Sequence, residues 1–153
     1  STAVKMGKSK FAVLDDYVYK SLASRGGIQG VIRGWSILYD GELPQSITYQ
    51  LTRNRYCEAI GRHHKSNQIM WTVDFVSMTS SQKCWDPECR ATGFRGERIP
   101  LPQDVEEKVG EVLFDFELAA MDLSPRNSAA CLKDKSNEKA EEAEPAVISE
   151  NDN

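Results

Sequence analysis

Three cysteines and one histidine, Cys57, His64, Cys84 and Cys89, follow the spacing C-x6-H-x19-C-x4-C. Thiolate and imidazole are the donors that zinc binds in tetrahedral sites. The two pairs of donors can meet only if the chain between His64 and Cys84 folds back on itself. The spacing therefore predicts a metal site joined by a hairpin. Four protein ligands leave no open coordination position, so we expect the metal to be structural rather than catalytic.

The residues next to these donors support the same interpretation. The second cysteine pair lies in CWDPEC, where Asp86-Pro87 favours a turn that lets both sulfurs face one point. Only one of the adjacent His63 and His64 can easily be a ligand, because neighbouring side chains of an extended chain point in different directions. We choose His64; His63 is then either a candidate surface cation or an exposed ring, and we favour the exposed ring. Cys131 lies apart, in polar low-complexity sequence.

Other roles for these residues fit the sequence less well. Buried thiols are common in hydrophobic cores, but Cys84 and Cys89 flank a polar turn. A zinc deaminase requires H-x-E and P-C-x-x-C, and neither pattern occurs around these residues. A cysteine nucleophile with His64 as its base is conceivable, but nothing in the sequence orients such a base.

Hydrophobic spacing in the first third of the chain predicts a helix and then a hairpin. In FAVLDDYVYKSLAS the apolar residues recur at helical spacing, so we expect a helix over residues 11–24. Ser9 is available as its cap and Gly26-Gly27 as its stop. The segments WSILY and SITYQL flank Asp40-Gly41 and Pro44, a pattern typical of two strands joined by a turn.

The remainder of the body predicts a second hairpin and a last helix. Apolar and more polar residues alternate over residues 69–76, which indicates a half-buried strand. The polar residues 77–81 turn the chain, and SQKCW can return as the partner strand. Beyond Pro102, apolar residues at helical spacing mark one face of an amphipathic helix: Val105, Val109, Val112 or Leu113, Phe116 and Ala120.

These elements predict a small α+β domain that is stabilised by zinc, with β-hairpins, flanking helices and a disordered acidic tail. We divide the 153 residues into a flexible N-terminal segment (1–10), the zinc-binding module (11–103), the amphipathic helix (104–124) and the tail (125–153). Segments as polar as this tail cannot bury enough apolar surface to fold. Because the chain begins with Ser1, we expect it to be a piece of a longer polypeptide.

Charge divides the chain in two. Residues 1–103 hold 14 Lys and Arg against 9 Asp and Glu, whereas residues 104–153 hold 5 against 14. A basic body suits a polyanion such as nucleic acid, and an acidic tail suits a basic partner or solubility. No apolar run approaches the roughly 18 residues of a membrane span, so we expect a soluble intracellular protein with no membrane partner.

Four stretches of the sequence are similar to one known family. GIQGVIRGW, RYCEAIGRHHKSNQIM, QKCWDPEC and IPLP together resemble the C-terminal zinc-binding region of eukaryotic DNA-directed primase-polymerases, which is related to the zinc region of herpesvirus primases. The resemblance covers about residues 11–116. It implies that the family's ligand set corresponds to Cys57, His64, Cys84 and Cys89.

The resemblance also implies a function. In the family, this module follows a catalytic core whose carboxylates bind magnesium or manganese for nucleotidyl transfer. This chain shows no D-x-E motif with a further catalytic aspartate in a strand context, so only the accessory module is expected here. Its implied role is to support primer initiation and repriming on single-stranded DNA, by holding the template and the initiating nucleoside triphosphate. The nucleus and the mitochondrion are the implied compartments.

Basic residues around the two ligand pairs are candidates for binding DNA or triphosphate. We select Arg53, Arg55, Arg62, Lys65, Lys83 and Arg90, with Arg95 and Arg98 nearby. Arginine can grip a phosphate through two hydrogen bonds, and such contacts weaken with salt. Of the tryptophans near the ligands, we expect Trp71 to be core. Trp85 is an open choice between base stacking and a structural role.

Two further hypotheses concern partners. The acidic tail invites comparison with motifs by which the family binds replication protein A, although the match is compositional. A rival from another class is a zinc-stabilised protein-interaction module, in which the helix over residues 104–123 docks a partner. Salt-sensitive binding of single-stranded DNA would favour the primase interpretation.

Overall fold

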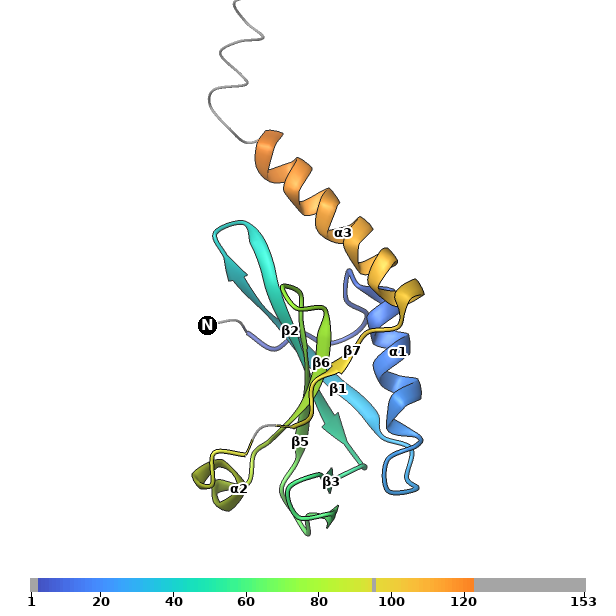
Figure 1. The fold of residues 1–153 in the computed structure, drawn as a ribbon, viewed down its shortest axis with the longest axis vertical. Helices are drawn as coiled ribbons and strands as arrows, with labels where there is room; N and C mark the ends of the chain where they lie inside the picture. The colour runs from blue at the N-terminus through green and yellow to red at the C-terminus, as the bar shows by residue number, and fades with distance from the viewer. Residues whose placement is uncertain (1–2, 95, 123–153) are drawn as a thin grey trace, which may run out of the picture. The chain divides into compact units, whose positions relative to one another are not determined.

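The computed structural model describes residues 3–94 and 96–122. Residues Ser1–Phe116 form one compact unit, and the second unit begins at Glu117. The elements, shown in Figure 1, are α1 (Ala12–Leu22), β1 (Val31–Asp40), β2 (Leu43–Thr52), β3 (Tyr56–Cys57), β4 (Arg62–His63), β5 (Ile69–Asp74), β6 (Thr79–Cys84), α2 (Pro87–Ala91), β7 (Ile99–Pro100) and α3 (Gln103–Asp122). The expected α+β class, with hairpins and flanking helices, is confirmed.

Antiparallel hairpins build the main sheet, whose strand order is β1-β2-β5-β6-β7. The predicted turn between the first two strands is present, and Gly41 adopts a positive φ of 64° there. Pro44 was expected in that turn but lies in β2. It pairs with Tyr39 where the register shifts, and an irregularity of this kind tolerates a residue without an amide hydrogen.

The hydrophobic core lies on one face of this sheet. As predicted, Ile69, Trp71, Val73 and Phe75 point to the same side and are at most 5% exposed. Helix α1 covers them with three buried residues, and the first turns of α3 add Val105 and Val109 to the same cluster. The opposite face of β2, β5 and β6 therefore carries the alternate, more polar residues of each strand.

Helix α1 is shorter than the predicted range of residues 11–24, and Phe11 rather than Ser9 occupies its N-cap position. Ser9 still braces the start of the helix. Its hydroxyl accepts a hydrogen bond from the Phe11 amide at 3.0 Å and donates one to Asp15 at 2.6 Å. Asp15 lies in the first turn and also accepts the hydroxyl of the buried Tyr49 at 2.7 Å. The hydrophobic spacing predicted the helix, but it did not predict the hydrogen bonds through which Ser9 and Tyr49 hold its first turn.

The segment expected to be flexible, residues 1–10, is attached to the sheet within its described part. Lys5 and Trp35 exchange both backbone hydrogen bonds, at 2.8 and 2.9 Å, and the Trp35 indole donates to the Gly7 carbonyl. At the other end, the acidic tail over residues 125–153 lies outside the described residues, as does Cys131. Among the described helices, none has the length and apolar character needed to cross a membrane.

Candidate metal centre

The structure brings together the four residues that the spacing singled out. Their donor atoms, three sulfurs and one imidazole nitrogen, all lie within 4.8 Å of one another. All four side chains are buried, with Cys57 fully inside and His64 7% exposed. The three cysteines form a small buried cluster separate from the main core. The predicted residues therefore form a cluster that could hold a metal ion.

The distances within the cluster suit a tetrahedral ion. A zinc–sulfur bond of about 2.3 Å places two sulfurs of a tetrahedron about 3.8 Å apart. The Sγ atoms of Cys57 and Cys89 are 3.8 Å apart, and Cys89 Sγ lies 3.7 Å from His64 Nε2. Cys84 Sγ is nearer to that nitrogen, at 3.0 Å. A small outward movement of either side chain would give this pair a tetrahedral spacing.

Two short backbone structures present the donors. In the first, β3 and β4 form a tight ribbon in which Gly61, at a φ of 67°, donates its amide to the Cys57 carbonyl. This ribbon places Cys57 at its start and His64 just beyond its end. In the second, Cys84 ends β6, and α2 carries Cys89. The turn expected at Asp86-Pro87 is the start of this short helix.

The ribbon also separates the two adjacent histidines. His64 points into the cluster, whereas His63 packs edge-on against Tyr56, and its Nε2 lies 3.2 Å from the Gly26 carbonyl. The structure thus brings His64, rather than His63, to the three sulfurs.

Asp86, which the sequence suggested only as a turn residue, holds the histidine in place. One of its carboxylate oxygens lies 3.2 Å from His64 Nδ1 and 2.8 Å from the Asn67 amide nitrogen. The other accepts the Glu88 amide at the start of α2. The Glu88 amide above all, together with Asn67 and His64, lowers the pKa of Asp86. An anion at Nδ1 fixes the ring so that Nε2 faces the sulfurs, which is the usual arrangement behind a metal-bound histidine.

Burial raises the pKa of two of the clustered thiols. The pKa of Cys84 is raised mainly by desolvation, and that of Cys89 is raised to about 12 by desolvation and its two neighbouring thiols. A bound divalent cation reverses this effect, since it stabilises thiolate directly. The Asp86 amide also points at Cys84 Sγ from 3.3 Å, and this contact favours the thiolate.

A buried polar network, which the sequence did not reveal, attaches the β3–β4 ribbon to the sheet. Arg25 forms an ion pair with Glu58 at 2.9 Å and lies 4.5 Å above the Trp71 ring. The Gln82 side chain accepts the Glu58 amide and donates to the Tyr56 carbonyl. These contacts join residues 24 to 46 positions apart, so no local pattern could have indicated them.

Asn54 adds a second anchor, three residues before the first cysteine. It is fully buried, and its amide nitrogen lies 2.6–3.1 Å from the carbonyls of Leu22, Arg25 and Ile28. Its side-chain oxygen accepts the Tyr56 amide at 2.9 Å. The only sequence signal was an asparagine beside a strand end.

The candidate nucleic-acid residues separate into several places. Lys83 and Arg90 line one cavity, together with Arg98. Arg62 lines a smaller cavity of about 250 Å³ that touches the metal cluster.

The other candidate cations lie around the first ligand pair. Arg55 is half-buried and donates to the Lys65 carbonyl at 3.5 Å. Arg53 and Lys65 are exposed, and Arg95 lies outside the described residues.

Comparison with known proteins shows that the segment containing the cluster is similar to DNA primases. Residues 43–104, which contain all four clustered residues, match the family of Herpesviridae UL52/UL70 DNA primases. The resemblance to primases is confirmed. The chain is also 42% identical over 90 residues to the DNA-directed primase/polymerase protein of Homo sapiens, covering 59% of this chain and 16% of that protein.

Further relatives agree with this match. The proteins of the same description from Bos taurus and Gallus gallus are 40% and 39% identical over 97 and 98 residues, covering 63% and 64% of this chain. The chain spans less than a fifth of the length of these relatives, 17% and 16% of the two proteins. No match was found among solved structures. The match and the cluster together support a primase-type metal-binding module.

Proposed function

We propose that this chain is the zinc-binding module of a DNA-directed primase-polymerase, and that it supports primer initiation and repriming on single-stranded DNA. The observation that carries the proposal is the gathering of four donors within 4.8 Å, inside the segment that matches primases. In this proposal Cys57, His64, Cys84 and Cys89 are the ligands. The module binds the template and the triphosphate of the initiating nucleotide.

Zinc is the metal that this donor set suits best. Three thiolates and one imidazole select soft or borderline ions over magnesium and calcium, which prefer oxygen. Because the protein fills all four positions, the ion holds the two ligand segments together and leaves no coordination site for substrate. Magnesium or manganese would belong to the catalytic core of the parent enzyme.

A phosphate-binding module helps most when no primer exists. During extension, base pairing and the catalytic core already position the incoming nucleotide, whereas the first nucleotide has neither aid. A module that holds the template and a triphosphate would therefore lower the barrier to initiation more than the barrier to extension.

The metal itself is tested by native mass spectrometry of freshly purified, unchelated protein. We expect one zinc per chain, and we expect Cys84→Ala to lose it together with much of the ordered structure around residues 57–89. Structural zinc contributes on the order of 10 kcal/mol in small zinc modules, so this loss should be large. Unchelated protein without zinc would refute the metal assignment.

The role in initiation is tested in a full-length primase-polymerase that contains this module. We expect Cys84→Ala, and the double change of Arg62 and Lys65 to Ala, to depress primer synthesis far more than extension of a preformed primer. The double change should keep zinc and act through binding that weakens as salt rises. Equal loss in both reactions would show that the module has a general structural role instead.

A further inference from the structure

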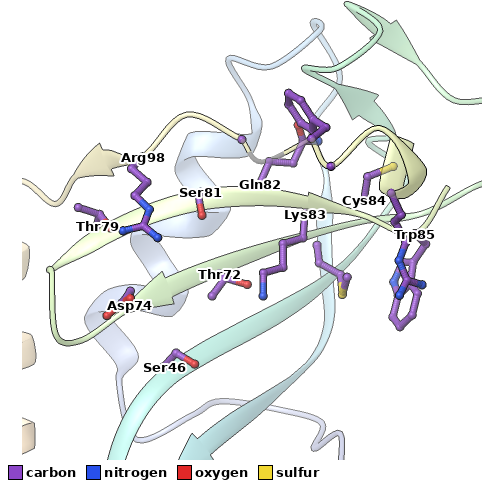
Figure 2. Close-up of a pocket in the computed structure, with 15 residues that line it drawn as sticks. Ser46, Thr72, Asp74, Thr79, Ser81, Gln82, Lys83, Cys84, Trp85 and Arg98 are labelled. Carbon is purple, nitrogen blue, oxygen red and sulfur yellow. The ribbon is translucent and has the colours of Figure 1, made fainter. Parts of the chain in front are cut away.

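A groove of about 670 Å³ lies on the face of the sheet opposite the core (Figure 2). Its floor is formed by β2, β5 and β6, and one wall is formed by α2 and the segment that leads to β7. This wall lies tightly on the sheet, because a Cβ at Gly96 would come within 2.8 Å of the Gln82 backbone. Two strands of the floor also connect to the metal cluster, because β5 follows His64 in the chain and β6 ends at Cys84.

The floor of the groove is rich in hydroxyl groups and holds one carboxylate. Strand alternation sends Ile47 and Val73 to the core and leaves hydroxyl side chains on the open face: Ser46, Thr72, Thr79 and Ser81. Asp74 is the only carboxylate among the described residues that line the groove, and it already accepts the Val76 and Ser77 amides. Hydroxyls can hydrogen-bond to phosphate or base atoms without repelling an anion.

Three cations line the same groove. Lys83, Arg90 and Arg98 are exposed, and none of them forms a salt bridge within the part of the chain that the structure describes. Figure 2 shows Arg98 beside Thr79 at one end of the groove and Lys83 further along the floor. The groove thus holds three cations and one carboxylate, Asp74, whose charge is already engaged by backbone amides. The resulting positive field suits a polyanion.

An exposed aromatic ring closes the other end. Trp85 is 45% exposed, whereas Trp35 and Trp71 are buried. Its backbone is held in place, because the Trp85 amide donates to the Gln68 carbonyl and the preceding residue is the metal-cluster Cys84. A ring that is held by its backbone and open on its surface can stack on a base with little loss of freedom.

We propose that this groove binds single-stranded nucleic acid, with one base stacked on Trp85 and neighbouring phosphates beside Lys83, Arg90 and Arg98. The proposal rests on the function proposed above and names the surface that would hold the template. From Thr79 to Trp85 the strand spans roughly 20 Å, at about 3.3 Å per residue, which is long enough for a few nucleotides.

Single-stranded nucleic acid fits this surface better than an acidic peptide does. Both would use the cations, but only a base uses a flat aromatic ring at the end of a hydroxyl-lined floor. Duplex DNA has its bases already stacked and paired, so it could not use Trp85 in this way.

The test measures binding of a fluorescently labelled oligodeoxythymidylate to the whole chain by anisotropy. Stacking on an aromatic side chain contributes about 1–3 kcal/mol per base, so Trp85→Ala should weaken binding roughly 5- to 150-fold. Trp85→Phe should restore most of the affinity. Lys83→Gln should reduce the slope of log affinity against log salt by about 0.7, the value for one phosphate contact in a single strand.

Controls separate this proposal from the fold and from the metal. Lys108→Gln, which removes an exposed cation on α3, should leave the salt slope unchanged. All four variants should keep one zinc per chain. If Trp85→Ala and Lys83→Gln bind like the unmodified protein, the groove assignment is wrong, whereas the function proposed above is judged separately by zinc content and priming. A glutamate-rich peptide that binds with the same dependence on Trp85 would also overturn it, because the groove would then be a peptide site.

Discussion

Asn54 offers the sharpest test of how the first ligand segment is held. In Asn54→Ala, the Leu22 carbonyl keeps a second donor, the Arg25 amide at 3.2 Å. The carbonyls of Arg25 and Ile28 and the amide of Tyr56 would lose the side chain that pairs with them. A buried polar group left without its partner costs about 1 kcal/mol or more. Three such groups predict a loss of about 3 kcal/mol in the free energy of unfolding.

This loss is measured by urea denaturation of the zinc-loaded protein. A change of this size would also lower the melting temperature by roughly 10 °C for a unit of about 115 residues. Asn54→Asp should be at least as damaging, because a carboxylate accepts the Tyr56 amide but repels the three carbonyls. The matched control is Gln29→Ala, since Gln29 also donates its amide to two carbonyls, those of Tyr19 in α1 and Gly30 in the following loop, but is exposed to water.

The outcome that would refute the reasoning is specific. If Asn54→Ala costs no more than about 0.5 kcal/mol, as ordinary surface substitutions do, then water or a local rearrangement satisfies these groups. The loop between α1 and β1 would then not be what positions the Cys57 segment.

Four further variants test other contacts in the structure. His63→Ala should keep zinc, and His64→Ala should weaken zinc binding, as a zinc-release assay will show; the opposite result would reverse the ligand assignment. Asp86→Asn should lower zinc affinity about 10- to 100-fold, the usual effect of removing a group that orients a ligand, while circular dichroism should stay native. Tyr49→Phe should cost about 1.5–2 kcal/mol in urea denaturation, because Asp15 loses a charge-assisted hydrogen bond; an unchanged midpoint would mean that Ser9 satisfies this carboxylate alone.

The sequence predicted features that depend on the spacing of neighbouring residues or on the chemistry of single residue types. Alternation over residues 69–76 revealed a strand because the side-chain period of a strand is two, and the structure buries the predicted side. The hairpin that brings Cys84 back to His64 followed from the spacing of donor types. The four candidate ligands could be selected because few other groupings of cysteine and histidine suit a buried cluster.

What the sequence could not predict depends on contacts between distant segments. The stacking of Arg25 on Trp71, and the role of Gln82 as a bridge, arise only when the loop after α1 meets β5 and β6. Arg25 looks like any other surface cation in the sequence. The groove was hidden for the same reason, since Arg98 and Lys83 come to line one cavity only through the antiparallel return of the chain along β6.

The separation of the cysteine cluster from the main core has a consequence for cooperativity. The main core draws on α1, β1, β2, β5 and α3 and includes none of the clustered cysteines. We therefore expect the cysteine cluster to open locally at a lower free energy than the main core, although polar contacts connect the two. When zinc is removed by a chelator, backbone amides of the β3–β4 ribbon and α2 should exchange with solvent within the earliest time points, while those of β1 and β2 stay protected. The ion would thus determine how often the β3–β4 ribbon and α2 open, and would leave the opening rate of β1 and β2 unchanged.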